Sequence, residues 1–414
     1  MPLIRPFSGL RPAPQFAAEV AAPPYDVLTT EEARARAAGR PNSFLHISKP
    51  EIDLPAGTDP HDDTVYARGR ENFARMIAEG VLARDPAPCF YLYRLEMGGH
   101  AQTGLVAAAS VQAYEDGRIR RHEFTRPDKE DDRTRQIDAL NAQTGPVFLT
   151  YRHRGGIDRL ASSLVDRDPD VDLRAGDGVR HTLWVVSDPA DCAAITAAFD
   201  GVERLYVADG HHRSAAAARV AAARRRANPA HTGKESYNFF LAVVFPDDQV
   251  QILDYNRVVR DLNGLSRTDF LRRVGEAFDA VESQRPCRPT RHAEFGMYLK
   301  GQWYRLRRRP ERTLSQDPVA RLDVSILADE IIGPVLGVVD PRRDRRIDFV
   351  GGIRGLEELQ RRVDSGEMAV AFALYPTGLE ELMDVADADG IMPPKSTWFE
   401  PKLADGLVSH VLDG

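Results

Sequence analysis

Residues 205–219 constrain the fold more strongly than any other stretch of this chain. They open with the apolar run Leu205–Ala208, break at Asp209 and Gly210, and continue into alanine-rich sequence from His211 onward. An apolar run is typical of a buried strand, glycine favours a tight turn, and alanine has the highest helix propensity. The stretch therefore predicts a strand, a glycine turn and a helix, in that order.

The predicted turn also concentrates polar chemistry at the start of the helix. The first backbone N–H groups of a helix lack partners within it, and together with the positive end of the helix dipole they attract anions. His211 and His212 can each donate to an oxyanion, and Arg213 can hold a phosphate or a carboxylate with two hydrogen bonds. We expect a phosphate site here, with the Gly210 N–H beside it. The alternative is a tight turn whose polar residues are only solvated.

The run Ala208-Asp209-Gly210-His211-His212-Arg213 resembles the signature of the DUF1015 family, which is widespread in bacteria and archaea. The likeness extends over nearly the whole chain. It includes Pro23-Pro24-Tyr25-Asp26-Val27, His122-Glu123, residues 141–148, Tyr255-Asn256-Arg257-Val258-Val259 and Met392-Pro393-Pro394-Lys395-Ser396-Thr397. More distantly, the run is similar to the phosphate-binding motif of the ParB/sulfiredoxin superfamily, which includes ParB-like free serine kinases. This resemblance implies a ParB/sulfiredoxin-like core that carries the strand–loop–helix phosphate site.

At 414 residues the chain is longer than a domain with a single hydrophobic core normally is, so two or three domains are expected. We predict a mixed α/β (α+β) fold in three parts. Residues 1–151 form an N-terminal mixed α/β region with a charged cluster, residues 152–262 hold the ParB-like core, and residues 263–414 form a C-terminal α/β domain. A β–α–β order of elements leading into Asp209 places the core in the second part.

A second cluster of candidate site residues precedes that core. We expect an Asp-Gly hairpin turn at residues 115–118 and a returning strand that ends in His122 and Glu123. Adjacent strand residues face opposite ways, so only one of the two is expected to face a pocket. Next, a helix that begins at Pro127 carries Lys129 and Arg133.

The many charges of that helix have two interpretations. Acids in its first turn, with Glu130–Arg133 and Asp131–Arg135 pairs, would make an ordinary solvated face. The resemblance to DUF1015 favours a binding site instead, because members of the family carry a similar charged run at the positions of residues 122–133.

Four other positions each keep two interpretations. Asp26, presented by a stiff proline segment, is either a ligand for a metal or hydroxyl or a residue of the turn before a helix. Arg257 either reaches an anionic ligand or is an exposed strand residue. His46 is expected on a strand, as a satisfied histidine rather than a ligand. Residues 392–397 form either a rigid loop that faces a ligand or an anchored tail.

Charge and cysteine content exclude several classes of protein. The net charge of −7 argues against nucleic acid as a partner, because non-specific binding needs a basic surface. The three cysteines lie far apart and match no metal-binding or disulfide pattern. The chain starts without the apolar segment of a signal peptide, and no apolar run approaches the roughly 18 residues that span a bilayer. We therefore expect a cytoplasmic protein with no membrane partner, and a homo-oligomer is compatible with the sequence.

The absence of several well-known motifs further reduces the number of possible enzyme classes. The sequence has no Gly-x-x-x-x-Gly-Lys-Ser/Thr loop, no His-Glu-x-x-His, no Gly-x-Ser-x-Gly and no Rossmann glycine pattern. A P-loop NTPase, a zincin, an α/β-hydrolase and an NAD enzyme are therefore disfavoured. An oxyanion site with acids and bases around it remains, which is the set of groups that phosphoryl transfer needs.

The leading hypothesis, which the resemblance implies, is a kinase that uses ATP or ADP with Mg²⁺ and phosphorylates a small hydroxyl metabolite. Free L-serine is the first substrate to test. The catalytic residues would be Glu123 as general base, Asp209, His211 and His212. Gly210, His211, His212 and Arg213 would hold the phosphates of the nucleotide. His122, Lys129, Arg133 and Arg257 would bind the substrate, and Asp26 and Asp209 would hold Mg²⁺.

Two alternatives stay open at this point. A phosphatase or nucleotide hydrolase would use the same oxyanion site with water as the acceptor. A ParB-like regulatory protein would bind a nucleotide without turning over a small molecule.

Overall fold

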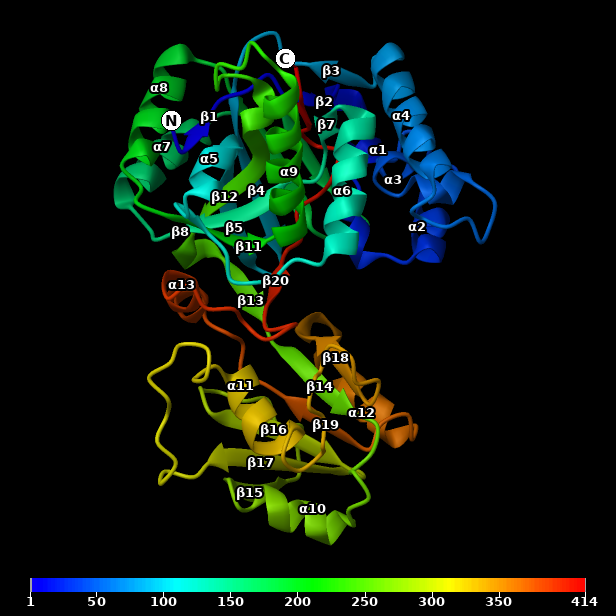
Figure 1. Ribbon diagram of the computed structural model, residues 1–414, viewed down its shortest axis with the longest axis vertical. Helices are drawn as coiled ribbons and strands as arrows, with labels where there is room; N and C mark the ends of the chain where they lie inside the picture. Colours follow the sequence, from blue (N-terminus) through cyan, green and yellow to red (C-terminus); the bar gives the residue numbers. More distant parts are fainter. Residues whose placement is uncertain (1, 414) are drawn as a thin grey trace. The chain divides into compact units, whose positions relative to one another are not determined.

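The computed structural model describes residues 2–413 and has a mixed α/β fold, as predicted. The chain forms two compact units (Figure 1). The first unit contains the residues up to Val250 and those from Pro401 onward, and the second contains Gln251–Glu400. Within the described chain, no helix combines the length and the apolar character needed to cross a membrane.

The first unit is built on a nine-stranded sheet. Its strands run in the order β6 (Ile119–Arg120), β11 (Leu205–Asp209), β8 (Val147–Tyr151), β12 (Phe239–Pro246), β5 (His100–Ser110), β4 (Phe90–Met97), β10 (Arg180–Val186) and β9 (Val171–Arg174), and β1 (Ile4–Arg5) pairs with β5 beside this path. The pairs β6–β11 and β8–β12 are parallel, and the other pairs are antiparallel. Every residue of β12 is buried, because this central strand is covered on both faces.

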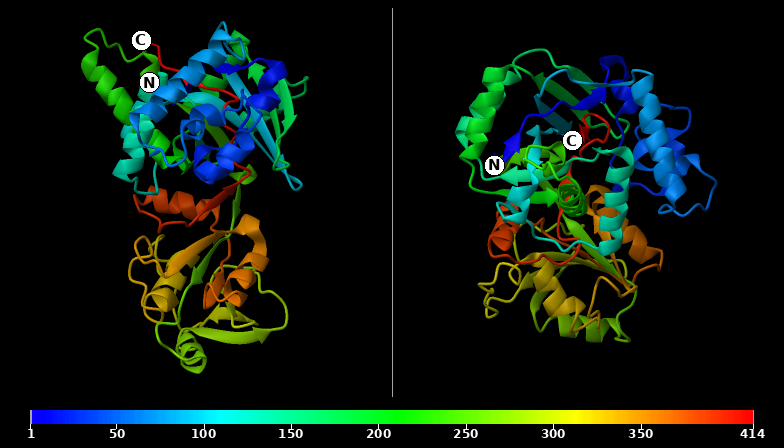
Figure 2. Two further views of the ribbon diagram at one scale, coloured as in Figure 1. Left: turned by 90° about the vertical axis from the view of Figure 1, so that its right-hand side faces the viewer. Right: turned by 45° about the horizontal axis from the view of Figure 1, so that its top comes forward.

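Helices of the first unit pack on this sheet and on one another (Figures 1 and 2). They are α5 (Val111–Glu115), α6 (Pro127–Leu140), α7 (Gly155–Leu164), α8 (Pro189–Asp200) and α9 (His211–Ala227). Small residues of α9 face the core: Ala217 and Ala221 pack against the sheet, and Ala216 and Val220 pack against Ile137 of α6. The alanine-rich sequence thus lets α9 lie close to both the sheet and α6.

A smaller cluster of N-terminal elements completes the first unit. It contains the helices α1 (Ala17–Val20), α2 (Thr30–Ala37), α3 (Leu45–Ser48) and α4 (Asp63–Ala78), the short turns η1 (Pro14–Phe16), η2 (Tyr25–Val27) and η3 (Pro50–Asp53), and the strand pair β2 (Leu10–Pro12) and β3 (Leu82–Arg84). Its core includes Phe44, Ile47, Phe73 and Met76. The end of the chain joins the unit through β21 (His410–Val411), which pairs with β7 (Ala142–Gln143).

The second unit is an antiparallel six-stranded sheet with helices packed on it. The strands run in the order β15 (Phe278–Ser283), β17 (Gln302–Arg308), β16 (Glu294–Leu299), β19 (Val370–Ala373), β14 (Tyr255–Val259) and β18 (Ile347–Gly351). Its helices are α10 (Arg267–Val274), α11 (Asp323–Leu327), η6 (Ala328–Ile332), α12 (Gly355–Asp364) and α13 (Leu379–Asp387). Leu359 of α12 packs against Val258 and Tyr298 of the sheet. The two ends of the unit pair with each other as β13 (Gln251–Leu253) and β20 (Trp398–Glu400).

These two units group the chain differently from the predicted segments 1–151, 152–262 and 263–414. The nine-stranded sheet takes strands from both sides of residue 151, and β14 already belongs to the second sheet. The residues from Pro401 onward return to the first unit. Which unit a residue belongs to depends on pairing between strands far apart in the sequence. Changes in local composition along the chain cannot predict this pairing.

Two local predictions are wrong. His46 lies in the helix α3 rather than on a strand. The chain after β5 does not make a hairpin, because Ser110 caps α5 by accepting a hydrogen bond from the N–H of Ala113 at 3.1 Å. The strand β6 then pairs in parallel with β11, with Ile119 opposite Leu205.

Candidate functional site

The turn between β11 and α9 has the predicted strand–turn–helix structure. Gly210 precedes the first residue of α9 and has a φ of +97°, a left-handed conformation that residues other than glycine rarely adopt. A Cβ atom at this position would lie only 3.0 Å from Nε of Arg213. The backbone conformation therefore favours glycine, and a side chain at this position would also press against Arg213.

The parallel pairing of β6 with β11 brings the second predicted cluster to the same end of the sheet. The rings of His122 and His211 meet edge to face, with centroids 4.4 Å apart. Nδ1 of His211 lies 3.7 Å from Oε2 of Glu123, whose side chain is half exposed. Three of the predicted site residues are thus gathered around the start of α9.

Both histidines of this pair are buried and neutral at neutral pH. Burial lowers the pKa of His122 to about 4. Burial, together with the neighbouring His122, lowers the pKa of His211 well below its ordinary value. Nδ1 of His122 and Nε2 of His211 have no hydrogen-bond partner among residues 2–413. Because buried polar atoms normally have one, these two ring nitrogens are suited to contact a ligand.

Asp209 and Arg213 form the charged part of the turn, together with Lys402. Nζ of Lys402 lies 3.6 Å from Oδ2 of Asp209, and Nη2 of Arg213 lies 3.7 Å from Oδ1. Burial opposes the ionisation of Asp209, but Lys402 and Arg213 outweigh it and hold the pKa of this carboxyl well below its ordinary range. Arg213 also donates from Nη1 to the carbonyl oxygen of Pro146, in the loop before β8. The guanidinium is therefore charged and fixed in place.

A cavity of about 40 Å³ lies beside this turn, and two arginines line it. Arg213 is one, and the other is Arg133 of α6, whose Nη2 lies 2.7 Å from Oδ2 of Asp132. The Arg133 guanidinium also stacks 3.9 Å from the centroid of the Tyr25 ring. The structure thus brings together two of the cations that the sequence singled out.

Sequence reasoning missed two residues of this region, Lys402 and Asp405. Asp405 lines the cavity, is 2% exposed, and its Oδ1 has no hydrogen-bond partner in the described chain. Burial raises its pKa to about 7, although Arg213 and Arg133 oppose that shift. Its backbone pairs with Ala22, which anchors the C-terminal segment in the first unit. No local motif marks either residue, because both reach the site only through this long-range return of the chain.

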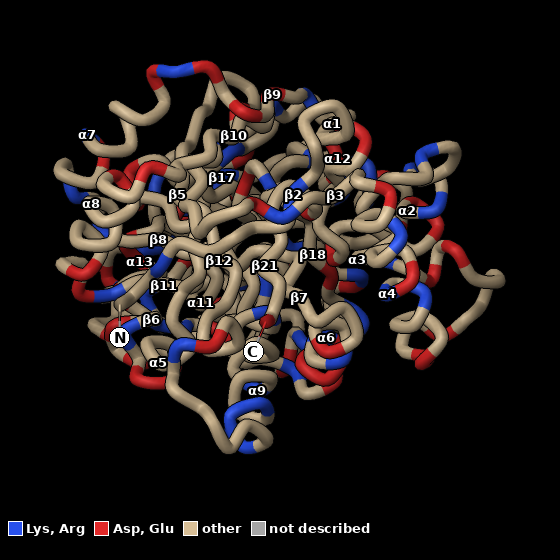
Figure 3. Tube along the Cα trace, turned by 90° about the horizontal axis from the view of Figure 1, so that it is seen from above, with Lys and Arg blue, Asp and Glu red and all other residues tan. Residues whose placement is uncertain are grey.

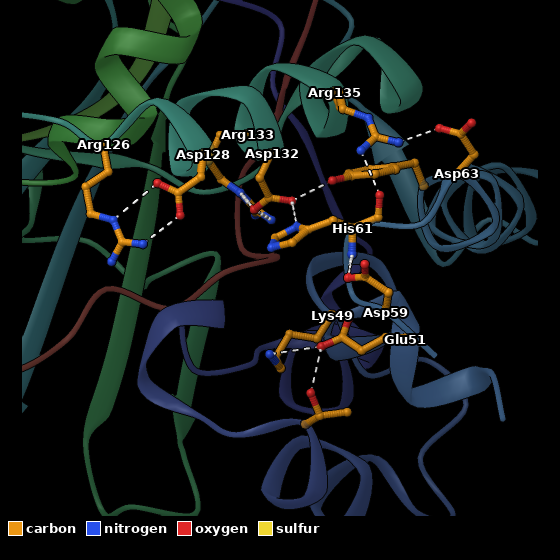
Figure 4. A network of polar contacts seen from close by, with 12 residues as sticks. Lys49, Glu51, Asp59, His61, Asp63, Arg126, Asp128, Asp132, Arg133 and Arg135 are labelled. Carbon is orange, nitrogen blue, oxygen red and sulfur yellow. Dashed lines mark hydrogen bonds and ion pairs between the residues drawn. The ribbon is translucent and has the colours of Figure 1, made fainter. Parts of the chain in front are cut away.

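The charges of α6 do not form the predicted pairs Glu130–Arg133 and Asp131–Arg135. Both acids contact Arg219 of α9 instead, at 3.4 Å for Glu130 and 2.6 Å for Asp131. Arg135 donates to the carbonyl oxygen of His61 at 2.7 Å and pairs with Asp63 (Figure 4). Acidic and basic residues both occur along α6 (Figure 3), and its neighbours α9 and α4 supply the partners.

His212 connects the starts of the two helices. Its Nε2 accepts a hydrogen bond from the N–H of Arg126 at 3.1 Å, directly before α6. Burial lowers the pKa of His212, so the ring is neutral at neutral pH and its proton is on Nδ1. Lys129 lies half-buried in the first turn of the same helix.

The two remaining predicted residues lie in different units. Asp26 is exposed in η2, and its charge helps to raise the pKa of Arg213, so it belongs to the surroundings of the turn. Arg257 lies on β14 of the second unit and is 5% exposed, so it is not the exposed strand residue of the second interpretation.

The carboxylates are compatible with a Mg²⁺ ion held largely by phosphates. The described residues contain no group of three or more His, Cys, Asp or Glu side chains that could bind a metal by themselves. Magnesium commonly uses only one or two carboxylates together with phosphate oxygens and water. Asp209 already has two cations within 4 Å, which leaves the exposed Asp26 as the better-placed ligand.

Comparisons with known proteins give one family and several distant structures. The family model described as "Protein of unknown function (DUF1015)" matches residues 4–325. A mutant free serine kinase in complex with ADP is 13% identical, covers 73% of this chain and 92% of its own, and has a TM-score of 0.33. A conserved hypothetical protein from Pyrococcus furiosus is 12% identical over 73% of this chain and 95% of its own, with a TM-score of 0.31. The C-terminally truncated SbnI from Staphylococcus aureus is 11% identical over 72% and 85%, with a TM-score of 0.37. No curated protein matches the chain.

Proposed function

We propose that this chain, which belongs to the DUF1015 family of proteins of unknown function, is a nucleotide-dependent phosphotransferase that acts on a small hydroxyl metabolite. The observation that carries the proposal is the gathering of a charged arginine, two neutral histidines and two carboxylates at the glycine turn before α9. Donors for a phosphate and a carboxylate for a hydroxyl proton are the groups that phosphoryl transfer requires.

The phosphates of ATP or ADP would bind at the start of α9. The free N–H groups of the helix and its dipole favour an anion there. Arg213 would supply a fixed positive charge, and Nε2 of His211, which has no partner within the described chain, would donate to a phosphate oxygen in the tautomer that carries the ring proton there. Neutral His212 would present its Nδ1–H from the next position of the helix.

The acceptor hydroxyl would lie between the terminal phosphate and Glu123. Its oxygen forms a bond to the phosphorus, the bond from that phosphorus to the nucleotide breaks, and Glu123 takes the hydroxyl proton. The carboxylate of Glu123 suits this role because its side chain is half exposed beside His211.

Substrate anions would be held by the cations around the cavity. Arg133 lines it with Arg213, and His122 and Lys129 are the further candidates in this unit. Free L-serine is the acceptor to test first, because it carries both a hydroxyl to phosphorylate and a carboxylate that an arginine can bind. When bound, Mg²⁺ would neutralise charge on the phosphates; Asp26 would be its first carboxylate ligand, and Asp209 the second candidate.

The test is phosphorus NMR of the purified protein with Mg²⁺, ATP or ADP, and L-serine. We expect a phosphoserine signal that is lost in Arg213→Ala and retained in Arg224→Ala, a matched control at the far end of α9. Glu123→Gln should lower turnover by roughly 100-fold or more while leaving nucleotide affinity nearly unchanged. Free phosphate as the sole product would identify a hydrolase, and nucleotide binding without any product would identify a regulatory protein; either result overturns the proposal.

A further inference from the structure

A buried arginine in the second unit lacks a counter-ion. Arg257 is 5% exposed, and its guanidinium donates to the carbonyl oxygens of Tyr255 at 2.6 Å and Pro394 at 3.5 Å. No carboxylate within residues 2–413 forms an ion pair with it. A buried charge without an ion-pair partner is energetically costly, so a bound anion would stabilise the guanidinium of Arg257.

A second cation lies on the same aromatic ring. Nζ of Lys395 is 5.7 Å from the centroid of the Tyr255 ring, and Cζ of Arg257 is 5.8 Å from it. The Arg257 guanidinium also lies 4.8 Å from the centroid of the Phe349 ring. Lys395 is exposed and also has no acidic partner within the described chain, so two cations without an ion pair lie near the ring of Tyr255.

The loop that carries Lys395 holds it in an unusual conformation. Lys395 has a φ of +60°, which is rare for a residue with a side chain. Ser396 donates to the carbonyl oxygen of Pro393 at 2.6 Å, and Thr377 donates to the carbonyl oxygen of Ser396 at 3.0 Å. Backbone strain that neighbouring contacts maintain in this way occurs preferentially where ligands bind.

We propose that Arg257 and Lys395 form a phosphate-binding site in the second unit. A phosphate monoester carries up to two negative charges, which balances both cations, whereas a single carboxylate would leave one uncompensated. Arginine binds phosphate with two parallel hydrogen bonds, and lysine contributes a point charge. The rings of Tyr255 and Phe349 offer an apolar surface to the group that bears the phosphate. This site does not depend on the phosphotransferase proposed for the first unit.

Hydrogen–deuterium exchange of the full chain, with inorganic phosphate as the probe, tests the site locally. We expect phosphate to slow exchange in residues 392–397, with an apparent affinity about tenfold weaker in Lys395→Ala. Lys300→Ala is the matched control, because Lys300 is also an exposed lysine of the second unit with a positive φ, +46°. The control should behave as the unmodified chain does. An absence of protection, or equal protection in Lys395→Ala, would overturn the proposal.

Two further measurements distinguish phosphate binding at Arg257 and Lys395 from general anion binding and from phosphate binding at the α9 turn. Acetate at the same concentration should protect residues 392–397 much less than phosphate; equal protection would refute the preference for phosphate. Protection at residues 205–215 is read from different peptides of the same experiment, so the two sites are distinguished directly. Arg257→Lys, which retains the charge but not the planar fork, should weaken phosphate binding while leaving the second unit folded.

Discussion

At the scale of single residues, the carboxyl of Asp405 ionises at an unusually high pH for a buried acid beside arginines. It is buried beside two arginines, yet its Oδ1 lacks a hydrogen-bond partner among the described residues, and burial raises its pKa to about 7. In an unfolded chain an aspartate ionises near pH 3.9. Between these two values the folded protein keeps a proton that the unfolded chain has released, so its stability falls as the pH rises.

Replacing this carboxyl with an amide should remove that pH dependence. Asp405→Asn should match the unmodified chain near pH 4 and become more stable than it above pH 7, by up to about 4 kcal/mol. Urea unfolding at a series of pH values measures the difference. Asp138→Asn, at the exposed surface of α6, serves as the control and should leave the pH profile unchanged. A profile of Asp405→Asn parallel to that of the unmodified chain would contradict the expected ionisation.

At the scale of elements, the glycine turn couples the backbone of α9 to its first charged side chain. Gly210 needs its left-handed conformation, and Arg213 folds back over the space where a Cβ atom would stand. The conformation of the turn at Gly210 therefore also determines where the Arg213 guanidinium lies.

Gly210→Ala should act on both stability and ligand binding. The positive φ should cost about 1–2 kcal/mol, and the Cβ atom should displace Arg213 and weaken nucleotide binding. Gly178 is the matched control, because it has a φ of +89° and a Cβ atom added there would meet no other atom within 4 Å. Gly178→Ala should lose comparable stability in thermal unfolding and keep its nucleotide affinity in calorimetry. Equal affinity in both variants would show that the turn does not position Arg213 for the nucleotide.

At the scale of the whole molecule, the last residues of the chain hold the first unit together. Leu412 packs with Ile137 of α6 and with Ala216 and Val220 of α9, and β21 pairs with β7. The same segment brings Lys402 to Asp209.

A chain that ends at Glu400 should therefore lose the first unit selectively. We expect a lower unfolding temperature for the first unit and faster proteolysis of α6 and α9, whereas the second unit keeps its own transition. Calorimetry combined with limited proteolysis checks this, with Lys402→Ala as a control that removes one charge but leaves Leu412 and the β21–β7 pair in place. A first unit of unchanged stability would show that the returning segment contributes little.

The sequence predicted those parts of the site that depend on neighbouring residues. Residues 205–219 contain their own strand, turn and helix signals, and Pro127 marks the start of α6, so both elements were foreseeable. The ion pairs of Glu130 and Asp131 were not, because their partner Arg219 lies on another helix. Asp405 was missed for the same reason: its burial and its raised pKa arise from segments hundreds of residues away.

The pairing of β13 with β20 has a consequence for how this architecture could arise and be altered. Because the first and last strands of residues 251–400 lie side by side, this segment is a self-contained cassette inserted into a surrounding chain. A shortened gene in which Val250 is joined to Pro401 through a brief linker would retain every strand of the nine-stranded sheet and the whole α9 turn. Such a host scaffold could accept a different cassette at the same point, and so acquire a new regulatory or substrate-binding module without redesign of its own core.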